Sequence, residues 1–101
     1  MLKNYRQDQI EKTHALLRVI GDVNNLLILY ELINFGEKSF NELKRMTSIN
    51  AVTLTKKLNS LKIDGYIHSH HRGKENHYYP TTQARQLVPL IKEIEKAIVK
   101  P

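Results

Sequence analysis

Small polar and basic side chains gather around residues 51–63, a stretch whose apolar pattern predicts a helix. Leu54, Leu58 and Leu61 recur on one face of that helix, so its other faces are free to meet a partner. A helix enters the major groove of DNA, where amides pair with adenine, methyl groups contact thymine, and lysine reaches guanine or a phosphate. An ordinary amphipathic surface helix is the alternative interpretation. The side chains predicted to contact DNA are Asn50, Val52, Thr53, Thr55, Lys56, Lys57 and Asn59.

The positive charge of the chain is concentrated in one third of its length. The 101 residues carry a net charge of +6, and between Lys44 and Lys74 seven lysines and arginines accompany a single acid, Asp64. Such a confined excess is typical of a surface that binds a polyanion, although a solvated lysine-rich face has the same composition. Two groups in this segment are predicted to contact the DNA backbone or the minor groove. They are Lys44 and Arg45, and then Arg72, Gly73 and Lys74 at the tip of a predicted hairpin.

Three histidines form the only pattern that suggests a sensor. His68 and His70 alternate along one face of a predicted strand, and a two-residue turn at Gly73-Lys74 places His77 opposite His70. Three imidazoles on one face could bind Zn, Ni or Cu, or could titrate near pH ~6.5. No carboxylate or cysteine obviously completes a ligand set, so the sequence predicts neither a metal nor another cofactor. We favour the interpretation that protonation adds positive charge to a DNA-facing hairpin.

Several function classes are excluded by motifs that the sequence lacks. It contains no cysteine, which removes disulfides, thiolate catalysis and thiol redox sensing. It has no glycine-rich phosphate loop, no His-Glu-x-x-His motif and no nucleophile–base pair, so an enzyme is not predicted. No apolar run is long enough to cross a bilayer, and the first residues lack the apolar segment of a secretory signal. We therefore expect a cytoplasmic protein with no membrane partner.

The elements that position these residues follow from caps, breakers and periodicity. Asn41 is predicted to cap a brief helix, Asn50 the helix that follows it, and Thr81 or Thr82 the last helix. Pro89 falls inside the last helix and is expected to kink it or break it in two. The predicted order is helix, helix, extended link, helix, helix, hairpin and helix, over about 3–19, 23–35, 37–40, 42–46, 51–63, 66–79 and 82–99.

This order predicts an α+β fold that is mostly α, a winged helix-turn-helix with extra N- and C-terminal helices. We expect one DNA-binding domain over 1–101, made of an N-terminal helix 1–20, a helix-turn-helix 41–64, a wing 66–79 and a C-terminal helix 82–99. The terminal helices carry more apolar side chains than one small core needs, which predicts a dimer interface. Its expected members are Ile10, Leu17, Leu87, Leu90, Ile91, Ile94 and Ile98.

A set of short motifs runs through three quarters of the chain in a defined order. They are Ile20-Gly21, 26–32, 40–45, Ile49, Leu54-Thr55, Leu58, Leu61, 64–67, 79–82 and 87–90. In these motifs the chain resembles the HxlR-type winged-helix transcriptional regulators, relatives of the MarR group. The resemblance implies a homodimeric regulator that binds double-stranded DNA sequence-specifically, with the first and last helices building the dimer interface. The chain departs from the family at Val23-Asn24, where Lys-Trp is common, in its missing N-terminal cysteine, and in a shorter wing without prolines.

Two other interpretations stay open from the sequence. One is a winged-helix module that binds an acidic protein, and the other is a MarR- or ArsR-like regulator that responds to an effector or a metal. A protein interface would centre on apolar anchors, for which the oddly placed Ile63 is a candidate, whereas DNA binding predicts a steep dependence on salt. The identity of any small-molecule effector is left open.

Overall fold

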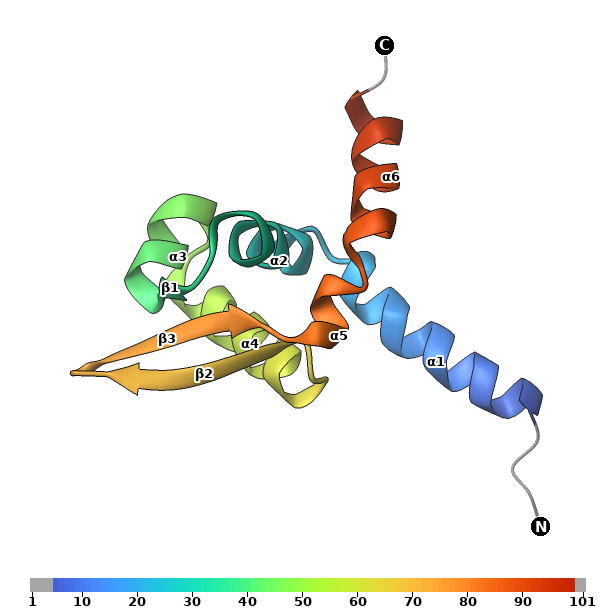
Figure 1. The fold of residues 1–101 in the computed structure, drawn as a ribbon, viewed down its shortest axis with the longest axis horizontal. Helices are drawn as coiled ribbons and strands as arrows, with labels where there is room; N and C mark the ends of the chain where they lie inside the picture. Colours follow the sequence, from blue (N-terminus) through green and yellow to red (C-terminus); the bar gives the residue numbers. More distant parts are fainter. Residues whose placement is uncertain (1–4, 100–101) are drawn as a thin grey trace.

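The computed structural model describes residues 5–99 and consists, over that range, of helices around a small sheet (Figure 1). The winged helix-turn-helix predicted from the sequence is confirmed. In chain order the elements are α1 (Tyr5–Ile20), α2 (Val23–Phe35), β1 (Lys38–Ser39), α3 (Phe40–Thr47), α4 (Ala51–Ile63), β2 (Ile67–Arg72), β3 (Glu75–Pro80), α5 (Thr82–Arg85) and α6 (Val88–Val99). No helix within 5–99 is both long and apolar enough to span a membrane.

Side-chain caps set where most of these helices begin. The Asp22 carboxylate accepts the backbone N–H groups of Asn24 and Asn25, and so begins α2. Asn50 begins α4 in the predicted way, because its Oδ1 accepts the N–H of Thr53 at 2.9 Å. Such caps satisfy N–H groups that have no partner inside the helix.

The expected cap of α3 by Asn41 is wrong. Ser39 is the cap: its hydroxyl accepts the N–H of Glu42, and the Glu42 carboxylate accepts the N–H of Ser39 in return. This reciprocal pair satisfies two N–H groups at once, so it is preferred over the single bond that Asn41 would offer two residues later. The helix therefore begins at Phe40, before the predicted start.

The segment expected to be an extended link contains the short strand β1, which completes a three-stranded antiparallel sheet in the order β1-β3-β2. The turn between β2 and β3 is the predicted Gly73-Lys74, and Gly73 adopts a φ of +62° that suits glycine. The resulting register places His70 opposite His77, as the sequence predicts. On its other side β3 pairs with β1, where Ser39 lies opposite His77.

The core lies between α2 and the helix-turn-helix. Helix α2 packs against α1, α3, α4, α5 and β3, which buries Ile28, Leu29 and Leu32. Four other large apolar side chains of α2 are exposed: Val23, Leu27, Tyr30 and Phe35. The predicted inward face of α4 is confirmed, since all three of its leucines are buried. The principal side chains of this core are Ile28, Leu29, Leu32, Leu43, Leu54, Leu58, Leu61 and Ile67.

The terminal helices extend beyond this core. The break expected in the last helix is present, because α5 ends at Arg85 and α6 begins at Val88, with Pro89 in its first turn where a missing N–H costs no hydrogen bond. Helices α1 and α6 point away from the body in different directions (Figure 1). The radius of gyration is 14.9 Å, against about 13 Å for a compact domain of this length.

Candidate nucleic-acid interface

The candidate interface centres on the solvent-facing side of α4. Val52 is 67% exposed at the start of the helix, although an apolar side chain of this kind is usually buried. Lys56 and Asn59 continue the same side toward the C-terminus and are both exposed. One face of α4 is thus anchored in the core while the other presents a methyl-bearing, a basic and an amide side chain.

Three further polar residues of α4 make hydrogen bonds within the fold. Asn50 uses its Oδ1 to cap the helix, so its amide N–H₂ is the part left for a partner. Thr53, whose N–H receives that cap, is half-buried. The Thr55 hydroxyl donates to the carbonyl of Ala51 at 2.8 Å, which leaves its methyl group outward. Asn59, by contrast with Asn50, is an exposed amide that does not cap a helix.

Lys57 departs from the expectation that it would reach outward from α4. Its Nζ forms an ion pair with the Asp22 carboxylate at the start of α2, and the two side chains are only 29% and 28% exposed. The hydrogen bond from Lys57, followed by those from the N–H groups of Asn25 and Asn24, holds the pKa of Asp22 below its usual value. Lys57 therefore joins α4 to α2 instead of facing a partner.

Helix α3 precedes α4, and both helices pack against α2. Leu43 of α3 and Ile49 in the connection to α4 are both buried. Ser48 turns the chain with a left-handed φ of 61° and donates its N–H to the carbonyl of Lys44. Lys44 and Arg45 themselves are exposed in the last turns of α3.

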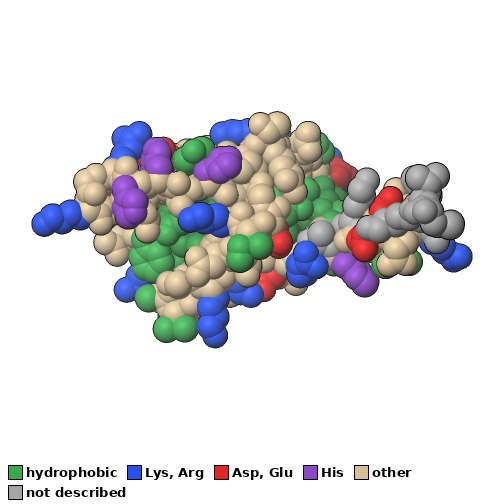
Figure 2. Space-filling model, turned by 90° about the horizontal axis from the view of Figure 1, so that it is seen from below, with side chains coloured by type: hydrophobic (Ala, Val, Ile, Leu, Met, Phe, Trp, Pro, Cys, Tyr) green, Lys and Arg blue, Asp and Glu red, His purple; other side chains and the backbone are tan. Residues whose placement is uncertain are grey.

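The hairpin β2–β3 adds a basic tip next to this helix pair. Arg72, Gly73 and Lys74 are all exposed there, as expected for a wing. Figure 2 shows lysine and arginine side chains projecting around this end of the molecule, with histidine side chains gathered over the hairpin. Six of the seven basic residues between 44 and 74 are exposed, the exception being Lys57.

The histidines of the hairpin are organised by a carboxylate that the sequence analysis missed. Glu37 Oε2 lies 3.1 Å from His70 Nε2, 3.3 Å from His77 Nδ1 and 3.1 Å from Arg72 Nε. The bond with His70, followed by the charges of Arg72 and the two histidines, lowers the pKa of Glu37. The sequence did not indicate this carboxylate, because only the pairing of β1 with β3 brings the preceding residue, Glu37, onto the hairpin beside two of the three histidines.

These contacts do not form a metal centre. His68 lies apart from Glu37 and packs its ring against Tyr79, with ring centres 5.3 Å apart. Arg72 already pairs with the Glu37 carboxylate, which a metal ion would need as a ligand. Between residues 5 and 99, no group of three or more His, Cys, Asp or Glu side chains is arranged to hold a metal ion.

The residues expected at a dimer interface divide into two groups. Leu87 packs against the core and Ile91 is 8% exposed, so the chain's own interior already covers much of both side chains, and their place at a dimer interface stays a prediction. Ile10 and Leu17 on α1 are 43% and 52% exposed, and Leu90 is half-buried. The side chains of Ile94 and Ile98 lie outside the described part of the chain.

The capped α3–α4 pair with its adjoining hairpin defines the class of this protein: a winged helix-turn-helix, the architecture of DNA-binding regulators of transcription. The family is equally definite. The chain belongs to the HxlR-like helix-turn-helix family, whose model matches residues 19–100. No curated protein matches the chain.

Solved structures share this architecture. The redox regulator HypR in its oxidized form is 29% identical with a TM-score of 0.74, over 84% of this chain and 91% of that chain. The transcriptional repressor BigR from Xylella fastidiosa is 25% identical with a TM-score of 0.75, over 93% and 96%. A homodimeric winged helix-turn-helix DNA-binding domain from Mycobacterium bovis, a possible ArsR-family regulator, is 17% identical with a TM-score of 0.78, over 96% and 91%, and is similar in fold alone.

Proposed function

We propose that this protein is a sequence-specific regulator of transcription that binds double-stranded DNA as a homodimer. The observation that carries the proposal is the outward side of α4, where Val52, Lys56 and Asn59 are exposed on a helix whose other side is fixed in the core. A rigidly held helix with short side chains near its N-terminus fits the major groove of B-DNA.

Each part of this surface has a role that its chemistry suits. Val52 meets a thymine methyl group, Asn59 pairs with a base edge, and Lys56 binds a guanine or a phosphate. Lys44 and Arg45 at the end of α3 neutralise phosphates beside the groove, and the tip of the hairpin does so on the flanking DNA. Lys57 has no place in this set, because Asp22 already holds its ammonium group.

The homodimer rests on the terminal helices. A stable monomer rarely extends a helix away from its body with apolar side chains toward water, yet α1 does so with Ile10 and Leu17. The radius of gyration, larger than that of a compact domain, supports the same conclusion. HypR and BigR are described as regulators, and the proposal extends that role to this chain.

Selection from random duplex DNA with the purified protein tests this function. We expect one enriched motif, and the affinity for that duplex to fall steeply with salt, by about 0.9 in log–log slope for each phosphate neutralised. Replacing both Lys56 and Asn59 with alanine should weaken binding by at least about tenfold. The matched control is Lys92→Ala, an exposed lysine on α6, which should leave affinity unchanged.

Two results would contradict the proposal. One is the absence of any enriched sequence together with equal affinities for the α4 variant and its control. The other is tight, salt-insensitive binding to an acidic protein, which would favour the winged-helix interaction module instead.

A further inference from the structure

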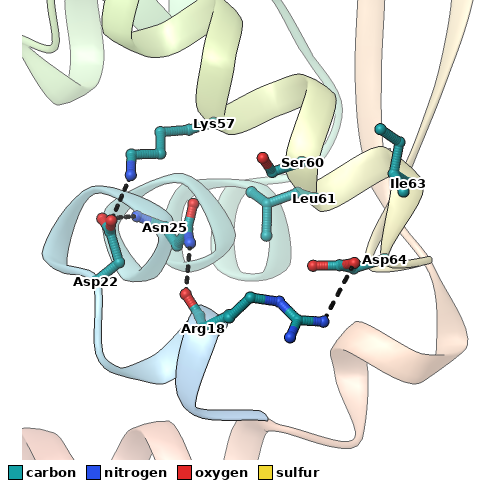
Figure 3. A pocket seen from close by; sticks show the side chains of 8 residues that line it. All are labelled: Arg18, Asp22, Asn25, Lys57, Ser60, Leu61, Ile63 and Asp64. Atoms are coloured by element: carbon teal, nitrogen blue, oxygen red, sulfur yellow. Dashed lines mark hydrogen bonds and ion pairs between the residues drawn. The ribbon is translucent and has the colours of Figure 1, made fainter. Parts of the chain in front are cut away.

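A cavity of about 340 Å³ opens between the end of α1, the start of α2 and the last turns of α4. Figure 3 shows charged side chains of both signs around it: Arg18 and Lys57 as cations, Asp22 and Asp64 as anions. The neutral polar residues Asn25 and Ser60 and the apolar Leu61 and Ile63 complete its lining. Its volume is within the range of small-molecule sites.

Asn25 is the buried polar residue of this cavity. It is 6% exposed, and its Nδ2 donates to the carbonyl of Arg18 at 3.0 Å. Its Oδ1 accepts no hydrogen bond from residues 5–99, although other buried side-chain oxygens and nitrogens in that range have partners. Figure 3 shows this oxygen on the side of Asn25 away from Arg18, facing α4. Buried polar groups of this kind are usually hydrogen-bonded to protein or to ordered water.

The two ion pairs in the cavity differ in the distance between their charged groups. Lys57 and Asp22 are in direct contact, so their charges are already satisfied. Arg18 Nη2 and Asp64 Oδ1 are 3.7 Å apart, which is beyond hydrogen-bond length. Arg18 therefore keeps donors for an incoming carboxylate, and Asp64 keeps acceptors for an incoming ammonium group.

We propose that this cavity binds a small zwitterion, an α-amino acid with an apolar side chain. Its carboxylate pairs with Arg18, its ammonium group pairs with Asp64, and its side chain packs on Ile63, which is 84% exposed. A simple organic acid is a poorer match, because on pairing with Arg18 it would place a second negative charge beside Asp64. A protein partner is also a poorer match, because the centre of a protein interface is depleted in charged residues.

The site connects two parts of the molecule with different tasks. Ile63 belongs to α4 and Asp64 caps its end, while Arg18 belongs to the projecting helix α1. An amino acid held between them fixes the angle between the helix that reads DNA and the helix that pairs with a second copy. This regulatory consequence rests on the proposed function, whereas binding itself depends only on the cavity.

Calorimetric titration of the intact, DNA-free protein tests binding without involving DNA. The probes are L-leucine, L-isoleucine, L-valine, L-methionine and L-phenylalanine, each titrated separately. We expect saturable binding of at least one, and a saturable rise in Tm with the same probe. For L-leucine the matched analogues are 4-methylpentanoate, which lacks the ammonium group, and isoamylamine, which lacks the carboxylate. Each should bind at least about tenfold more weakly than L-leucine.

Single substitutions locate the bound amino acid. Arg18→Gln and Asp64→Asn should each weaken binding by at least about tenfold, because each removes one of the two charges that hold the zwitterion. Arg85→Gln, an equal loss of charge on exposed α5, should bind normally. Circular dichroism and urea unfolding of each variant separate lost binding from lost folding.

The outcomes are decisive in both directions. Failure of all five probes to bind the folded protein overturns the site, as does binding that is equal in Arg18→Gln, Asp64→Asn and the control. Equal binding of 4-methylpentanoate overturns the zwitterion. If an amino acid binds as expected but no duplex is enriched in the selection above, the site stands and the proposed function fails.

Discussion

Lys56 and Lys57 are adjacent in sequence and carry the same charge, yet their surroundings in the structure differ. Lys56 is exposed on the outward side of α4, whereas Lys57 is paired with Asp22 at the start of α2. Separate alanine substitutions therefore form a matched pair in which size and charge change equally. We expect Lys56→Ala to alter DNA binding alone and Lys57→Ala to alter stability alone.

The expected magnitudes follow from these surroundings. Loss of one phosphate contact at Lys56 lowers the log–log salt slope by about 0.9, and an exposed substitution changes the free energy of unfolding by less than about 0.5 kcal/mol. Loss of the half-exposed pair at Lys57 costs about 1 kcal/mol, the upper end for such pairs, because Asp22 still caps α2 through the N–H of Asn24 at 2.9 Å. For a domain of this size that loss lowers Tm by about 4–8 °C.

Fluorescence anisotropy on the selected duplex over a series of KCl concentrations measures the slope, and urea unfolding measures the stability. Both are run on the two variants and the wild type. The reasoning is refuted if Lys57→Ala lowers the salt slope as much as Lys56→Ala while its unfolding free energy is unchanged. That outcome would mean that the contact with Asp22 is absent in solution and that both lysines face DNA.

Three further perturbations address other parts of the fold. Ser39→Ala removes the hydroxyl that accepts the Glu42 N–H and should cost about 1 kcal/mol in urea unfolding, and an unchanged midpoint would contradict the capping box. The depressed pKa of Glu37, due first to its bond with His70, means that its stabilising contribution is complete at neutral pH and is lost as the pH falls through that lowered value. Glu37→Gln should therefore show a smaller loss of stability than the wild type when unfolding is compared between neutral and acidic pH, and equal losses would refute this. Leu17→Glu should convert the dimer to a folded monomer in sedimentation at micromolar concentration, and a persistent dimer would exclude α1 from the interface.

Periodicity and caps predicted much of the fold because they act over short distances. The buried leucines of α4, the Asn50 cap and the two-residue hairpin turn all depend on neighbours in sequence. Asn41 and Ser39 are both acceptable capping residues, and the choice between them depends on the reciprocal bond of Glu42.

The parts of the interface that the sequence missed depend on distant contacts. Lys57 and Asp22 are 35 positions apart, and Glu37 and His70 are 33 apart. No periodicity relates such residues, since only the packing of α2 against α4 and of β1 against β3 brings them together. Ile91 is a similar case, because an apolar stripe predicts burial without telling whether the chain's own core or a partner supplies it.

Ser39 contacts both the hairpin and the helix pair α3–α4. Its backbone pairs with the hairpin at His77, and its side chain begins α3. The wing and the helix-turn-helix are therefore packed together as one head, which the contacts of α4 with β2 and of α3 with β3 also join. In a homodimer two such heads must reach major grooves about 34 Å apart, one turn of the duplex. Under the proposed function, a signal would act by changing the span between the two heads, which the tilt of α1 sets.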